Sequence, residues 1–194
     1  MFMSKYNTPK NVCNALTTFV TEIREQVAAI RAYDNVFQNT PCNNFFIQRA
    51  YESIWRELLS EIARIFDKAN TRSYENCTLL RVKDLCRDEK YSDLFPDNEK
   101  NNLLQSLEKV IEQYNQLPII TSRRKQLAHH DLEQVIDGKC IEISLEQIEQ
   151  LVEDVTSIFA KIRTRFYLGI YEITFAKYDI LVEKYENDIR KLLR

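Results

Sequence analysis

Turn-forming residues are scarce in this chain, because its 194 residues include only 2 Gly and 4 Pro. A sheet protein with many tight turns depends on these residues, whereas long helices do not. With 44% hydrophobic and 29% charged residues, the chain can bury one sizeable core and has little excess for disorder. We therefore expect an all-α fold, an up-and-down bundle of about five to six helices that forms a single domain over residues 1–194.

Apolar residues that recur at three- and four-residue steps predict the individual helices. The most regular patterns cover residues 9–37, 45–68 and 98–114, and the first two should pair antiparallel across a short loop. Ser144 and Gln147 form a capping-box pattern that opens another helix. A last helical pattern follows Gly169, which either breaks or loosens one long helix. The stretch from about 70 to 98 is a polar, irregular insertion, apart from a short helix predicted at 78–85.

Charge and cysteine content narrow the classes of function. The formal net charge of -2 argues against a protein that coats nucleic acid non-specifically, but it allows a local site for an anion. The five cysteines are an odd number without CxxC spacing, so we expect no zinc site, no cofactor and a reducing cytoplasm. The sequence has no apolar run typical of a signal peptide or a membrane span, so we expect no membrane association.

The most chemically distinctive stretch is 123–131, Arg-Arg-Lys-Gln-Leu-Ala-His-His-Asp, which holds both histidines of the chain, His129 and His130. Histidine exchanges protons near neutral pH, and arginine can bind a phosphate through two parallel hydrogen bonds. This combination suits phosphoryl chemistry on RNA. In a straight helix, Arg123 and His129 would diverge by roughly 120°. Either the helix bends before His129, or two copies of the chain bring their groups together at a two-fold axis.

A simpler interpretation of these basic residues is a solvated helix face, which is the commoner origin of such patterns. Asp131 would equally suit a plain helix end. Four further basic residues could extend a path for RNA or simply form a solvated helix face, namely Lys125, Lys161, Arg163 and Arg165.

Two segments resemble the HEPN superfamily and, within it, the AbiU-type abortive-infection branch, over about the middle half of the chain. One is Arg123 followed after five residues by His129, with the ending Ala-His-x-Asp. The other is Ala63 to Asp67, which is similar to what that branch shows upstream of its motif, although Ile65 and Phe66 also suit a core position.

This resemblance implies an all-α, HEPN-like fold, a homodimer with both motifs at a shared cleft, and metal-independent cleavage of RNA. Many such proteins are toxins or phage-defence effectors, some with an antitoxin partner. The catalytic arginine falls on Arg123 and the catalytic histidine on His129. Side-chain chemistry, rather than the family, suggests that His130 assists and that Asp131 orients an imidazole. Arg124 departs from the family, which commonly has a small polar residue there, and would either strengthen phosphate binding or distort the site.

We therefore expect an endoribonuclease, with a second function kept open. The same fold could be a non-catalytic dimeric module that binds a partner protein or a nucleotide. A hydrolase with paired carboxylates ranks last, because no acidic pair stands out from ordinary helix-surface charge.

Overall fold

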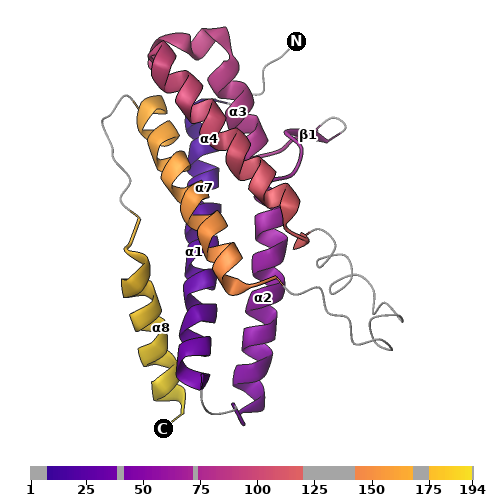
Figure 1. The fold of residues 1–194 in the computed structure, drawn as a ribbon, viewed down its shortest axis with the longest axis vertical. Coiled ribbons are helices and arrows are strands. Elements are labelled where there is room, and N and C mark those ends of the chain that lie inside the picture. The colour runs from indigo at the N-terminus through magenta and orange to yellow at the C-terminus, as the bar shows by residue number, and fades with distance from the viewer. Residues whose placement is uncertain (1–7, 39–41, 72–73, 120–142, 168–174, 194) are drawn as a thin grey trace. The chain divides into compact units, whose positions relative to one another are not determined.

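The computed structural model describes residues 8–38, 42–71, 74–119, 143–167 and 175–193. Within these ranges the chain is helical except for one very short hairpin and the connecting turns (Figure 1). The predicted all-α class is therefore confirmed.

The chain divides into two compact units, which are described separately. Unit 1 comprises the described parts of 1–20, 63–117 and 150–174, and unit 2 those of 21–62, 118–149 and 175–194. Three helices contribute residues to both units: α1 (Pro9–Phe37), α2 (Phe45–Ile65) and α7 (Leu145–Phe166). That the whole chain forms a single domain stays a prediction.

The helices predicted first along the sequence are present, and α1 has the predicted bounds. Asn44 caps α2, since its side-chain oxygen accepts hydrogen bonds from the backbone N–H groups of Phe46 and Ile47 at 3.0 and 3.2 Å. In unit 2, the ring of Tyr33 on α1 stacks on that of Tyr51 on α2, with centroids 4.0 Å apart. The two helices run antiparallel there, as predicted (Figure 1).

Helix α2 ends three residues earlier than predicted, at Ile65 rather than at residue 68. The backbone N–H of Asp67 bonds to the carbonyl of Arg64 at 3.3 Å, which is a tighter turn than that of an α-helix. The N–H of Lys68 bonds to the Asp67 side chain at 2.8 Å. Local hydrogen bonds of aspartate thus replace the helical ones.

The stretch predicted to be irregular contains more local structure than expected. Strands β1 (Asn70–Thr71) and β2 (Tyr74–Glu75) pair antiparallel. The predicted short helix is α3 (Leu79–Arg87), whose N-cap Thr78 accepts a hydrogen bond from the N–H of Arg81 at 3.2 Å. A 3-10 turn, η1 (Glu89–Leu94), follows.

Unit 1 has an apolar core between α1, α3, α4 (Asp97–Gln116) and α7. Phe66 lies flat on the ring of Tyr114, with centroids 4.1 Å apart and an interplanar angle of 3°. Phe95 meets Phe166 edge to face at 5.4 Å. Burying each large apolar side chain stabilises the fold by about 1.5–3 kcal/mol. The predicted burial of Ile65 and Phe66 is confirmed.

The last helix, α8 (Tyr178–Leu192), belongs to unit 2 and contains no buried residue. Its apolar Ile180 and Leu192 are exposed. The prediction concerning Gly169 lies outside the described residues. Among the helices that the structure describes, none has the length and apolar character needed to cross a membrane.

Candidate functional site

The Arg/His segment lies outside the described residues, which end at 119 and resume at 143. This applies to every residue predicted there: Arg123, Arg124, Lys125, His129, His130 and Asp131. Their roles stay predictions. The structure does describe both flanks of the segment, and both flanks belong to unit 2.

The preceding flank is anchored by Ile119, which is 0% exposed. It follows Pro118, which comes directly after the end of α4 at Gln116 and its C-cap, Leu117. Proline cannot donate a backbone hydrogen bond, so a helix boundary at this point agrees with the residue type. The chain therefore enters the segment from a fixed, buried position.

The following flank is the first turn of α7, and the predicted capping box is present there. The N–H of Gln147 donates to the hydroxyl oxygen of Ser144, and the N–H of Ser144 donates to the side-chain oxygen of Gln147, both at 3.2 Å. These bonds satisfy two N–H groups at the start of the helix that would otherwise lack partners. Buried Leu145 and Ile148 hold the same turn against unit 2.

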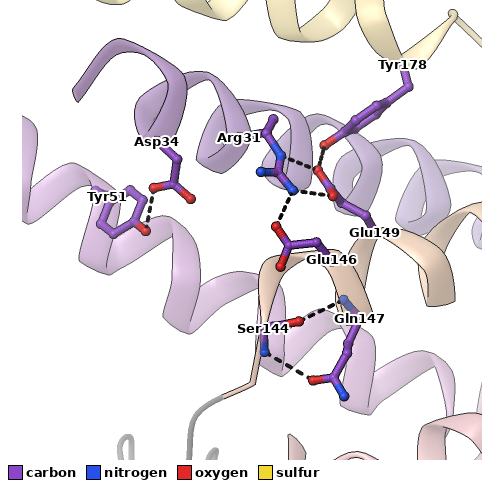
Figure 2. A network of polar contacts seen from close by, with 8 residues as sticks. All are labelled: Arg31, Asp34, Tyr51, Ser144, Glu146, Gln147, Glu149 and Tyr178. Carbon is purple, nitrogen blue, oxygen red and sulfur yellow. Dashed lines mark hydrogen bonds and ion pairs between the residues drawn. The ribbon is translucent and has the colours of Figure 1, made fainter. Parts of the chain in front are cut away.

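Arg31 of α1 binds this turn through two carboxylates (Figure 2). Its Nε and Nη2 donate to the two oxygens of Glu149 at 2.7 and 2.5 Å, and Nη2 also donates to Glu146 at 3.0 Å. The side chains of Arg31 and Glu149 are only 25% and 19% exposed, so water screens this fork-shaped pair weakly. The hydrogen bonds to Glu149 raise the pKa of Arg31 above its ordinary range.

Tyr178 at the start of α8 completes the contacts of Glu149. Its hydroxyl donates to Glu149 Oε1 at 2.6 Å (Figure 2). Burial, followed by the neighbouring Glu149 carboxylate, raises the pKa of Tyr178 well above its ordinary range, so this hydroxyl is a neutral donor at physiological pH. Glu149 thus joins α1, α7 and α8 within unit 2.

A second polar pair lies on the α2 side of unit 2. The Tyr51 hydroxyl donates to Asp34 Oδ1 at 3.0 Å (Figure 2). Burial raises the pKa of Asp34, while the hydrogen bond from Tyr51 acts in the opposite direction. The pair fixes α2 to α1 near their connection.

A pocket of about 410 Å³ opens beside Arg31 in unit 2. Besides Arg31, its charged lining residues are the carboxylates of Glu149, Asp179, Glu183 and Glu186. Four carboxylates against one guanidinium make it a poor site for a phosphate, since like charges repel. Within the described ranges, no group of His, Cys, Asp and Glu is placed to hold a metal ion.

Two buried cysteines of the described residues are not activated nucleophiles. Cys13, Cys42, Cys77 and Cys86 carry free thiols. Burial raises the pKa of Cys13 and of Cys86 to about 12, so both are protonated at neutral pH. A protonated thiol is a weak nucleophile and a poor metal ligand.

Three basic residues predicted to extend a path for RNA lie in unit 1, and each has a different environment there. Arg165 forms a forked ion pair with Glu99, in which its Nε lies 2.8 Å from Glu99 Oε1. The guanidinium of Arg163 instead lies 4.4 Å from the ring centroid of Tyr167. Lys161 is exposed. The structure thus does not hold the three together as one group.

Sequence reasoning missed the supporting contacts of Arg31, Glu149 and Tyr178. The apolar periodicity of α1 and α8 gives no sign of polar partners. One signal was available in α7, where Glu146 and Glu149 are three residues apart directly after the capping box. Residues three apart lie on the same face of a helix, so these two carboxylates can bind one cation on a neighbouring helix.

Most of the chain matches the model of one protein family. The family model HEPN_AbiU2, described as AbiU2, matches residues 14–191. The chain belongs to the AbiU2 family of HEPN proteins. Neither the curated proteins nor the solved structures gave a match.

Family membership confirms the resemblance and extends it beyond the middle of the chain. The matched range contains both segments that suggested it, 63–67 and 123–131. The all-α fold is accordingly HEPN-like. The match also takes in the anchoring residues of unit 2 on α1, α7 and α8.

Proposed function

We propose that this AbiU2-family protein is a metal-independent endoribonuclease of HEPN type, acting in the cytoplasm as a toxin or phage-defence effector. The observation that carries the proposal is the pairing of Arg123 with His129, with five residues between them, inside the range that matches the family. The two anchored flanks in unit 2 support it, since catalytic groups need firm positioning.

The chemistry follows from the two side chains. His129 acts as general base and removes the proton of a ribose 2′-hydroxyl, whose oxygen then attacks the adjacent phosphorus. As the bond between phosphorus and the 5′-oxygen breaks, a second histidine donates a proton to that oxygen. Arg123 stabilises the negative charge on the five-coordinate phosphorus. The products are a 2′,3′-cyclic phosphate and a 5′-hydroxyl.

The second histidine comes from a homodimer in this proposal. A two-fold axis through one cleft pairs His129 with His129 of the partner subunit, which takes the role of general acid. Helical pitch supports this arrangement, because Arg123 and His129 of one straight helix diverge by roughly 120°. His130 assists the proton transfer, and Asp131 orients an imidazole.

Arg124 allows two outcomes that a single variant separates. If Arg124 contributes to phosphate binding, Arg124→Asn weakens RNA binding and slows cleavage. If it distorts the site, the same change accelerates cleavage, because a small polar residue is common there in the family.

The main test is cleavage of a labelled single-stranded RNA by the purified protein in EDTA. We expect cyclic-phosphate products, and a loss of at least about hundredfold in His129→Ala/His130→Ala, as removal of general acid–base groups typically causes. Arg49→Gln is the control, since it removes only exposed contacts, an ion pair with Glu52 at 2.8 Å and a guanidinium 5.3 Å from the ring centroid of exposed Phe45. Intact RNA at every pH, or equal cleavage by the double variant, contradicts the proposal.

Expression in cells tests the role as a toxin, for which an antitoxin protein would be the partner. We expect growth to stop on expression and to recover with His129→Ala. If growth is unaffected and purified protein leaves RNA intact while it dimerises and binds nucleotide, the non-catalytic module on the same fold is the correct account.

A further inference from the structure

The basic residues near the end of α7 do not form one continuous stripe. At about 100° per residue, Arg163 points roughly 160° away from both Lys161 and Arg165. Tyr167, four residues after Arg163, lies on the same side as Arg163. The helix therefore presents two different basic faces, and only one of them is neutralised.

The neutralised face is that of Arg165. Its guanidinium is bound by both oxygens of Glu99, so it has little capacity left for a further anion. Arg163 has no such partner. Its Nε and Nη1 are shielded from water and make no hydrogen bond with any described residue. Buried donors without an acceptor are costly to a folded protein, and more so when they carry charge.

Residues of α1 meet the Arg163 face within unit 1. The Lys10 ammonium lies 5.6 Å from the ring centroid of Tyr167, and the Arg163 guanidinium lies 4.4 Å from the same centroid. The Tyr167 hydroxyl donates to the side-chain oxygen of Asn14, one helical turn after Lys10. Two cations thus contact one tyrosine, and neither forms an ion pair with a described carboxylate.

We propose that Lys10, Arg163 and Tyr167 form a phosphate-binding site for RNA, separate in sequence from the Arg/His motif. The aromatic ring holds the guanidinium by a cation–π contact and so fixes its orientation before a ligand arrives. Nη2, the guanidinium nitrogen of Arg163 that is not among these shielded donors, donates to a phosphodiester oxygen, and Lys10 adds a second positive charge. Arg163 is half-buried and Lys10 exposed, so the group lies at the surface of unit 1.

This inference rests on the proposed function for its choice of RNA. The test uses the inactive His129→Ala/His130→Ala protein and a fluorescent single-stranded RNA, with affinity measured by anisotropy. Arg163→Gln should weaken binding about tenfold, and Lys10→Gln somewhat less, as charge-assisted contacts to phosphate imply. Each should also reduce the slope of log affinity against log salt by about 0.7, the value for one phosphate contact on a single strand.

Arg165→Gln is the matched control, because it removes the same charge from the same helix but takes it from an existing ion pair. It should change RNA affinity less than about twofold, a weak long-range effect of a screened charge. Thermal unfolding supplies a second measurement. Arg163→Gln should keep or raise the Tm, since it removes unpaired buried donors, whereas a structural arginine would lower it.

Equal weakening by Arg163→Gln and Arg165→Gln would overturn the site, because it would indicate only general charge. A rise in the Tm of the unaltered protein with inorganic phosphate, without any effect of Arg163→Gln on RNA binding, would overturn RNA as the ligand. If active protein cleaves RNA while Arg163→Gln binds and cleaves normally, only this inference fails. If binding depends on Arg163 and no RNA is ever cleaved, only the proposed nuclease fails.

Discussion

The two units of this protein are stabilised in different ways. In unit 1, stacked aromatic rings and fully buried side chains such as Leu107 and Phe159 fill an apolar core, and the ion pairs of Glu108 lie at its surface. Unit 2 also has buried apolar residues, but α8 contributes none of them. That helix is held by hydrogen bonds, from Tyr178 to Glu149 and from Asn35 to Glu186.

This difference matters because both flanks of the Arg/His segment belong to unit 2. Apolar burial has no directional requirement, whereas a forked guanidinium–carboxylate pair fixes distance and direction. The turn that receives the chain after the motif is therefore positioned by specific polar contacts in addition to buried Leu145 and Ile148. Changes in unit 1 should lower stability, and changes in the polar contacts of unit 2 should lower cleavage out of proportion to stability.

The largest effect on stability should come from Phe159→Ala in the core of unit 1. Phe159 is 0% exposed, so the substitution leaves a cavity and should cost about 3–5 kcal/mol in the free energy of unfolding. Urea denaturation measures it. Cleavage per folded molecule should change little, and a selective loss of cleavage at full stability would contradict the comparison.

Arg31→Ala should have the next largest effect on stability. It should also reduce cleavage, by more than the loss of stability alone would. It leaves Glu149 without its main partner and should cost about 2 kcal/mol, as for a charged hydrogen bond that is not fully exposed. Cleavage should fall more than this loss of folded protein explains.

The matched control for Arg31 is Arg49→Ala, which breaks the exposed pair with Glu52. Because those side chains are 60% and 48% exposed, the change should stay within about 0.5 kcal/mol and leave cleavage intact. Similar results for both variants would mean that the Arg31 contacts have no special role.

Ser144→Ala should cost about 1 kcal/mol, since it removes the N-cap of α7. The double change Ser144→Ala/Gln147→Ala should cost less than the sum of the single changes, because the two residues bond reciprocally. Denaturant midpoints of the three variants test this. Strict additivity would show that the capping box does not act as a unit.

Tyr178→Phe should have a small effect that depends on pH. The variant loses one hydrogen bond to Glu149, at about 1 kcal/mol. The folded state raises the pKa of Tyr178 above its ordinary value of 10.0, so the contribution is complete below pH 10.0 and is lost as the pH rises toward the folded pKa. Wild type and variant should therefore converge above pH 10.0. A constant difference in unfolding free energy would rule this out.

The sequence predicted the elements whose cause is local. The apolar period set the bounds of α1, and reciprocal bonding between Ser144 and Gln147 set the start of α7. It could not predict that Arg31 binds Glu149, because that pair joins residues 118 positions apart and depends on how the helices pack. The run Lys161, Arg163 and Arg165 shows the same limit in part. Helical pitch alone turns Arg163 away from the other two, but it could not predict that Glu99 binds Arg165.

Activity of a mixed dimer tests the two-fold catalytic site most directly. Wild-type and His129→Ala/His130→Ala chains would be co-expressed with different tags, and the heterodimer purified through both. If both subunits supply a histidine to one cleft, the heterodimer should cleave RNA at least about hundredfold more slowly than the wild-type dimer, the usual cost of losing a general acid or base. Cleavage at half the wild-type rate would show that each subunit acts alone and would contradict the shared site.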